Sequence, residues 1–458
     1  MSISSYDVKV WEPRKIGDTA RGRWRVRWRV VGREHCKSFP VRVLADGLAG
    51  ELKDAARAGQ RFDEITGLPE TTLPVASTCS WYAHARGYAQ VKWPQLAGTS
   101  RRSVAEALTT VTVALMATRR GAPDPPVLRA ALFGWAFNPA RRGEPPAEVA
   151  AALAWAERAS LPVTLLENPA LIRVALDACA RTLSGRPAAA TTQRRKRAVF
   201  HNALSYAVEQ GLLAANPIDK IRWRPPEVAQ TVDRRVVVSP AQAAALLAAV
   251  RAQGERGKHM EAFFGCLYYA TFRPSEAVAL RAADCVLPDD GWGRIDLAAS
   301  APRPGRAWTD DGAARQPRGL KHRASAETRS IPIPPVLVTM LTAHLQEYGA
   351  APDGRLFATA RGGLVQDSGY TKVWQDARAA ALTPAQQASP LATRPYDLRH
   401  AAVSLWLNSG VPATEVARRA GHSVAVLLKI YAHCIDGQAD EANARITASL
   451  TAAARDAA

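Results

Sequence analysis

Residues 23–30 read RWRVRWRV, a strict alternation of arginine with tryptophan or valine. A period of two places Arg23, Arg25, Arg27 and Arg29 on one face of a strand and the apolar residues on the other. A turn signal at residues 31–34 and a second strand pattern over residues 35–43 predict a β-hairpin. A helical pattern over residues 45–58 follows. The chain should therefore begin with a small sheet that packs on one helix and carries a cationic outer face.

The cationic face has two interpretations. No acidic residue interrupts the four arginines within the strand, which favours a surface that enters a DNA groove, as β-ribbon readers do. The alternative is an ordinary solvated strand face. We favour the DNA-binding interpretation.

The remaining sequence predicts a multidomain, mostly α-helical protein. Residues 80–213 have helical periodicity with Pro-rich breaks at 122–127 and 142–146, and short strand patterns appear among helices after residue 239. We predict a β-rich domain over residues 1–68, a helical domain over 69–225, a mixed α+β domain over 235–445 and a C-terminal tail over 446–458. Ser239 and Pro240 are expected at the N-cap and first position of a helix.

Basic residues gather in the predicted helical domain as well. We expect these side chains to contact DNA phosphates, although a solvated helix terminus explains each cluster equally well. They are Arg101 and Arg102 in one cluster, and Arg194, Arg195, Lys196 and Arg197 in another.

Composition supports a polyanionic partner. The 458 residues include 60 Lys and Arg against 41 Asp and Glu, a formal charge of +19. The six cysteines lack the spacing of zinc ligands or of a disulfide framework. No apolar run is long enough for a membrane helix, and the N-terminus lacks a signal-peptide pattern. These features predict a soluble, cytoplasmic DNA-binding protein without a metal site.

Two arginines have the setting of an anion site. Arg273 precedes Pro274 at a predicted helix start, where free backbone N–H groups also face an anion. Arg399 lies on an otherwise apolar helix. Two guanidinium groups can bind two non-bridging phosphate oxygens and offset the charge of a pentacoordinate phosphorane. His422 follows Arg399 by twenty-three positions and Tyr431 follows His422 by nine.

Three segments of the C-terminal two hundred residues, ATFRPSEAVALR, YDLRHAAVSLWLNSGVPATEVARRAGHS and VLLKIYAHC, resemble the motif blocks of the tyrosine recombinase (phage integrase) family. The upstream half is similar in layout to integrases, with a β-rich arm-type DNA-binding domain before a helical, SAM-like core-binding domain. The resemblance implies that Arg273 and Arg399 bind the scissile phosphate and that His422 hydrogen-bonds it. It also implies that Glu276 supports the site and that Tyr431 forms a 3′-phosphotyrosine.

The family places a lysine on a β-hairpin to protonate the leaving 5′-oxygen. Lys321 in GLKHRASAETRSIPIP matches that position, with His322 as the alternative general acid. This chain departs from the family pattern at Tyr396, where a histidine is usual. Tyrosine can donate a hydrogen bond to phosphate but is a poor base at neutral pH, which favours His422 in any base role. We expect His400 to be a supporting, structural residue rather than a base.

The resemblance implies a site-specific recombinase that integrates a phage genome or mobile element, or excises it, without a cofactor. It implies a homotetramer on double-stranded DNA at attachment sites, together with a directionality factor or a host DNA-bending protein in some systems. Two alternatives are a catalytically silent DNA-binding regulator and a relaxing topoisomerase of type IB chemistry. The complete set of catalytic residues argues against the first alternative, and the basic N-terminal sheet argues against the second.

Overall fold

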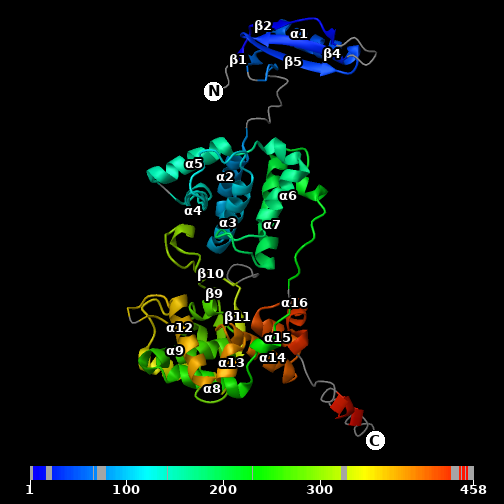
Figure 1. Cartoon of the computed structure of the whole chain (residues 1–458). Helices are drawn as coiled ribbons and strands as arrows, with labels where there is room; N and C mark the ends of the chain where they lie inside the picture. Colours follow the sequence, from blue (N-terminus) through cyan, green and yellow to red (C-terminus); the bar gives the residue numbers. More distant parts are fainter. Residues whose placement is uncertain are drawn as a thin grey trace. The chain divides into compact units, whose positions relative to one another are not determined.

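The computed structural model describes residues 4–16, 23–64, 66–69, 79–141, 143–228, 231–320, 327–359 and 361–434, and in the tail residues 443–444, 446–448 and 450–451. Helices dominate it, with small sheets, as predicted (Figure 1). The chain divides into two compact units, residues 1–95 with 103–225 and residues 96–102 with 226–458. The finer domain boundaries stay predictions.

The N-terminal sheet is built on the alternating strand. β4 (Arg23–Val30) pairs along its length with β5 (Arg33–Phe39). Its other edge pairs with β2 (Val8–Val10) and β3 (Arg14–Ile16). The β4–β5 turn consists of Val31 and Gly32, both with positive φ (50° and 98°), a geometry that matches the twist of a hairpin and that glycine adopts without steric cost. The predicted hairpin is confirmed.

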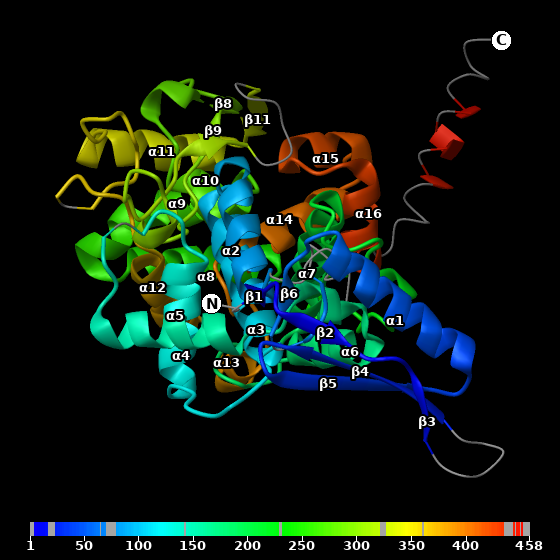
Figure 2. The same ribbon diagram turned by 90° about the horizontal axis from the view of Figure 1, so that it is seen from above.

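One helix covers the apolar face of this sheet. α1 (Arg42–Arg57) packs on β4, as Figure 2 shows, and buries Ala45, Ala49 and Leu52. From the strand, Val26 and Val30 enter the same core, and both are fully buried. The arginines of β4 are exposed, so the alternation separates an apolar and a cationic face as predicted. A short pair, β1 (Ser4–Ser5) with β6 (Phe62–Asp63), completes the fold of this region.

Where the structure describes the predicted helical region, its α-helices are α2 (Trp81–Lys92), α3 (Gly98–Ala114), α4 (Pro125–Ala131), α5 (Ala147–Ala159), α6 (Pro169–Ala178) and α7 (Ala190–Glu209). Trp81 is fully buried at the centre of this region. Its indole meets the Phe200 ring edge-on at 5.4 Å and donates a hydrogen bond to Thr112 Oγ1 at 2.9 Å. An aromatic anchor with a satisfied N–H fixes α2 against α7 and α3.

The unit that holds the C-terminal motifs is built around α9 (Gly254–Tyr269), which contacts α8 (Pro240–Arg251), α11 (Pro335–Tyr348) and α14 (Asp397–Asn408). Its other helices are α10 (Pro274–Ala277), α12 (Asp367–Ala381), α13 (Pro384–Ala388), α15 (Ala413–Ala420) and α16 (Val424–Tyr431). Ser239 caps α8 through a capping box with Gln242, and Pro240 is the first helical residue, which confirms that prediction.

Two small antiparallel sheets accompany these helices. β8 (Gly293–Leu297) lies between β7 (Cys285–Val286) and β11 (Arg329–Ile333). β9 (Ala299–Ser300) pairs with β10 (Arg318–Gly319). In β11 the burial alternates, so that Arg329, Ile331 and Ile333 all face the interior. The strand therefore carries an arginine into an apolar core.

Of the tail, the described residues are helical. Among the residues that the structure describes, no helix combines the length and apolar character that a membrane span requires. In the same part of the chain, no cluster of three or more His, Cys, Asp or Glu side chains has the proximity that a metal ion needs.

Candidate active site

A buried carboxylate joins two arginines at the start of α10. Glu276 is 2% exposed. It accepts hydrogen bonds from Arg273 Nη1 at 2.7 Å and from the Arg273 backbone N at 2.9 Å. Arg329 Nη2 donates to the same carboxylate at 2.8 Å and Nη1 at 3.2 Å. Burial alone would raise the pKa of Glu276, but the charges of Arg329, Arg273 and Arg399 lower it to about 2. Glu276 is therefore ionised and holds both guanidinium groups in place.

Arg399 is fully buried on α14. Its guanidinium donates to the carbonyl oxygens of Thr271 and Ala420, and to His422 Nε2 at 2.9 Å. Thr271 has a left-handed backbone (φ 55°), which is unfavourable for a β-branched residue and is typical of functional sites. Burial and the charge of Arg273 lower the pKa of Arg399 to about 10, so it remains a cation at neutral pH.

The glycine before His422 is required by close packing. Gly421 ends α15 in the left-handed conformation (φ 65°), and a Cβ there would lie 2.4 Å from Arg329 Nη1. The turn places the His422 ring beside Arg399. Since an arginine N–H can only donate, His422 Nε2 accepts and Nδ1 carries the ring proton. Within the described part of the chain, this buried Nδ1 has no hydrogen-bond partner. Burial and the Arg399 charge lower the pKa of His422 to about 3.

Tyr431 ends α16 with its side chain directed inward. It is 1% exposed and belongs to an apolar cluster with Val403, Val416 and Leu427. Its hydroxyl lies 2.9 Å from His400 Nδ1, and its ring stacks on the His422 ring at 6.2 Å. Burial raises the pKa of Tyr431, and the Arg399 charge opposes that rise. The phenol is therefore protonated in this arrangement and needs help to ionise.

Tyr396 and His400 lie on one face of the helix start at i and i+4. Their rings meet edge-on with centroids 5.0 Å apart. Tyr396 also interacts with the Arg273 guanidinium, whose pKa burial would lower but Glu276 and Tyr396 raise. Helix periodicity already places residues 396 and 400 side by side, so the spacing in YDLRH signalled this contact. The prediction of a structural role for His400 rested only on the different directions in which the neighbouring side chains of Arg399 and His400 leave the helix.

The structure thus brings together seven predicted residues: Arg273, Glu276, Tyr396, Arg399, His400, His422 and Tyr431. Lys321 and its alternative His322 lie outside the described residues. Sequence reasoning missed Arg329. An arginine at an inward position of the strand pattern RSIPI was the signal, since a charged residue on an apolar strand face needs a buried partner.

Comparison with known proteins adds to this geometry. Residues 237–437 match the sequence model of the phage integrase family. This segment has the sequence of a phage integrase domain. The matched segment contains all seven residues of the site, and the match confirms the resemblance found in the sequence. No curated protein matches the chain.

Several solved structures are similar in fold to this chain. A Tn1549 transposon integrase in complex with transposon right end DNA is 16% identical, with a TM-score of 0.47 over 67% of this chain and 95% of that chain. XerH site-specific recombinase bound to difH substrate is 12% identical, with a TM-score of 0.43 over 76% and 95%. A lambda integrase tetramer bound to a Holliday junction is 13% identical, with a TM-score of 0.44 over 88% and 91%.

The arginines that we expected to bind DNA differ in their surroundings. On β4 all four are exposed, and Arg27 forms a solvent-exposed ion pair with Glu34 at 2.9 Å and lies over the Trp11 ring. Arg102, Arg194 and Arg195 retain solvent exposure as well. Arg197 is half-buried and lies over the Trp223 ring, 5.0 Å from its centroid. These side chains stay candidates for phosphate contact.

Two residues of the basic clusters are corrections to the prediction. Arg101 is 5% exposed, and its guanidinium binds both carboxylate oxygens of Asp310 at 2.9 Å. Lys196 is 1% exposed and donates to the Arg181 carbonyl at 2.7 Å and to Thr110 Oγ1 at 3.0 Å. Because these cations are buried and occupied by protein groups, they hold the fold together rather than face phosphates in this structure.

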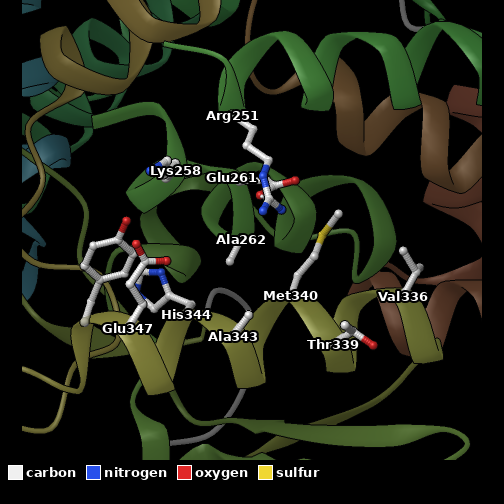
Figure 3. Close-up of a pocket in the computed structure, with 11 residues that line it drawn as sticks. Arg251, Lys258, Glu261, Ala262, Val336, Thr339, Met340, Ala343, His344 and Glu347 are labelled. Atoms are coloured by element: carbon white, nitrogen blue, oxygen red, sulfur yellow. Dashed lines mark hydrogen bonds and ion pairs between the residues drawn. The ribbon is translucent and has the colours of Figure 1, made fainter. Parts of the chain in front are cut away.

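A separate hollow lies between α9 and α11 (Figure 3). Arg251 of α8 and Glu261 of α9 lie next to each other on one side of it, forming an ion pair at 3.2 Å. His344 and Met340 line it from α11. It contains none of the residues of the active site.

Proposed function

We propose that this integrase cuts and rejoins DNA through Tyr431, forming a 3′-phosphotyrosine and freeing a 5′-hydroxyl. The observation that carries the proposal is the contact network of the site. The Arg399 guanidinium touches His422, the His422 ring stacks on Tyr431, and the Tyr431 hydroxyl reaches a histidine nitrogen at 2.9 Å. A tyrosine hydroxyl, two histidines and guanidinium cations thus lie in one buried site, which supports the proposed roles of nucleophile, base and phosphate ligands.

In this proposal Arg273 and Arg399 bind the non-bridging oxygens of the scissile phosphate. A phosphodiester carries one negative charge, and attack by tyrosine adds a second in the phosphorane. Guanidinium groups held in place by Glu276 and by backbone carbonyls need little reorganisation to meet that charge. The Nδ1–H of His422, buried without a partner among the described residues, is a further donor for the phosphate.

Covalent attachment conserves the energy of the phosphodiester, so rejoining requires no nucleotide. We propose Lys321 as the acid that protonates the leaving 5′-oxygen, with His322 as the alternative. The substrate is double-stranded DNA at attachment sites, and exchange between two duplexes requires four protomers. A directionality factor or a DNA-bending protein belongs to the same proposal, as does a cytoplasmic location.

The upstream regions would then grip the DNA. We propose that residues 1–68 bind arm-type sites through the exposed arginines of β4 and that residues 69–225 bind beside the crossover site. Residues 235–445 would be the catalytic domain and residues 446–458 a tail. The exposed cationic face of β4 and the formal charge of +19 support a DNA-binding role for the upstream regions.

A nicked suicide substrate tests the proposal. Such a DNA loses a short fragment after cleavage, so the covalent protein–DNA adduct accumulates and is seen by denaturing electrophoresis. The unmodified chain should form the adduct and Tyr431→Phe should form none. Adduct formation by Tyr431→Phe, or no adduct with the unmodified chain on its own attachment site, would contradict the proposed chemistry.

A further inference from the structure

His400 contacts the reacting atom of Tyr431. Its Nδ1 lies 2.9 Å from the tyrosine hydroxyl, a normal distance for a hydrogen bond between them. The imidazole is held between two aromatic rings, Tyr396 at 5.0 Å and Tyr431 at 5.7 Å between centroids. His400 thus comes from one helix, α14, and meets a nucleophile carried by another, α16.

The other histidine of the site is engaged elsewhere. His422 Nε2 accepts a hydrogen bond from Arg399 Nη2 at 2.9 Å, and its Nδ1 carries the ring proton. A ring nitrogen whose lone pair binds an arginine cannot take a proton from tyrosine until that bond breaks. His400 Nδ1, by contrast, lies against the tyrosine hydroxyl, and in the tautomer protonated at Nε2 its lone pair accepts a hydrogen bond from that hydroxyl.

We infer that His400 is the catalytic residue that removes the proton of Tyr431 as the tyrosine oxygen attacks the scissile phosphate. This inference rests on the function proposed above. It reverses our prediction from the sequence, which gave His400 a structural role and any base role to His422.

The proton balance of the step is simple. The tyrosine O–H proton passes to His400 Nδ1 while the tyrosine oxygen forms a bond to phosphorus. The bond from phosphorus to the 5′-oxygen breaks, and that oxygen takes a proton from a separate acid. In rejoining, the 5′-hydroxyl returns its proton to the conjugate base of that acid as its oxygen attacks the phosphotyrosine. The bond from phosphorus to the tyrosine oxygen breaks, and the His400 imidazolium returns its proton to that oxygen.

The charges around His400 fit a base that starts neutral. Burial, and then the charges of Arg394 and Arg399, lower its pKa to about 4, so the imidazole is neutral at neutral pH and one ring nitrogen is free to take up a proton. Tyr396 and Tyr431 are the titratable groups whose rings pack against it. A phosphodiester bound beside Arg399 brings a negative charge that raises the basicity of His400 when the proton must be transferred.

Single-turnover cleavage of the nicked suicide substrate tests the inference. Replacing His400 with alanine or asparagine should slow adduct formation by about 10²- to 10⁴-fold, the contribution of a positioned general base. DNA affinity and thermal melting are measured on each variant. The asparagine variant supplies the rate if the alanine variant melts early, because it fills most of the imidazole space. His433→Asn changes an exposed histidine two residues after Tyr431 and should cleave normally.

The asparagine variant also separates a base from a positioning residue. Its side-chain oxygen can accept the tyrosine hydrogen bond, but it does not take up the proton. Cleavage at the wild-type rate by His400→Asn would overturn the inference. The pH dependence gives a second test: the rate of the variants should rise with unit slope from about pH 6 to about pH 9, whereas the wild-type rate should be nearly flat. Identical profiles would also overturn it.

A substrate with sulfur in place of the leaving 5′-oxygen shows whether His400 acts on the nucleophile or on the leaving group. A thiolate leaves without protonation, so this substrate rescues the loss of a general acid but not the loss of a base. The defect of His400→Ala should persist, and full rescue would overturn the inference. If the wild type forms no Tyr431 adduct, the proposed function fails. If the wild type forms one and both His400 variants match its rate, the inference alone fails.

Discussion

The arginines of β4 and those of the active site differ in how the protein holds them. Arg23, Arg25, Arg27 and Arg29 are exposed, and the one ion pair described for them, between Arg27 and Glu34, has side chains that are 53% and 55% exposed. In the active site Arg329 is 2% exposed and donates to both carboxylate oxygens of Glu276. Arg399 is 0% exposed and donates to the carbonyl oxygens of Thr271 and Ala420.

The difference separates two uses of the same charge. The charge of an exposed arginine is hydrated and screened by salt, so each such arginine contributes a small, salt-dependent amount to the free energy of DNA binding. Removing a neighbouring side chain changes that contribution little. A buried arginine is already desolvated and oriented, so it can stabilise a transition state, but the structure around it depends on its partner. Mutations should therefore have local and large effects in the active site, and distributed, small effects on the sheet.

The largest effect is expected at Glu276. Glu276→Gln leaves Arg273 and Arg329 without a counter-charge in a buried site, and breaking a buried pair in this way costs about 3–5 kcal/mol. Urea unfolding of the full chain measures the destabilisation, with hydrogen exchange of the α9 and α14 amides reporting on the integrase domain. Glu415→Gln is the matched control. Glu415 also binds two arginines, Arg418 and Arg419, but is 30% exposed, so its replacement should cost under about 1 kcal/mol.

The destabilisation caused by Glu276→Gln should depend on pH. The pKa of Glu276 is about 2 in the fold and about 4.3 in an unfolded chain, so its ionisation stabilises the fold above about pH 4.3. That contribution is lost as pH falls through about 2. The difference in stability between wild type and Glu276→Gln should therefore shrink steadily below about pH 4. A difference that stayed constant down to about pH 2 would contradict an ionised Glu276.

A smaller but still local effect is expected at Arg399. Lysine keeps the charge in Arg399→Lys but cannot reach Thr271, Ala420 and His422 together, so cleavage should slow by about 10²- to 10³-fold with DNA affinity retained. Adduct formation on the suicide substrate measures the rate. Arg378→Lys changes another buried arginine that binds backbone carbonyls, away from the site, and should cleave at the wild-type rate. Equal defects in the two variants would show a general packing defect.

The smallest effects are expected on the sheet. Replacing Arg25 or Arg29 with alanine should lower the slope of log affinity against log salt by about 0.9 for each phosphate that the protein no longer neutralises, without changing cleavage at the crossover site. Salt titration of binding to arm-site DNA measures the slope. Arg57→Ala removes an exposed cation from α1 on the opposite side of the sheet and should leave the slope unchanged. An unchanged slope for the strand variants would remove this face from the DNA interface.

Local patterns predicted much of this molecule. The alternation in RWRVRWRV predicted a strand with one cationic face, because side-chain direction in a strand depends only on position along it. The capping residues Ser239 and Pro240 predicted the start of α8 in the same local way. Motif spacing predicted that Arg273, Arg399, His422 and Tyr431 form one site, because these residues match the family motifs in kind and order, and the structure places them close together.

Contacts between distant segments were decided by the tertiary structure. Arg329 of β11 binds Glu276 of α10 although fifty-three residues separate them in the sequence. Lys196 of α7 is buried where its ammonium group reaches Thr110 of α3. His400 reaches Tyr431 because α16 returns to α14. The sequence by itself determined which residue types were available and which face of a strand or helix carries them. Packing of those faces decided which charges are desolvated and paired, because burial and partner distance depend on segments that are far apart in the chain.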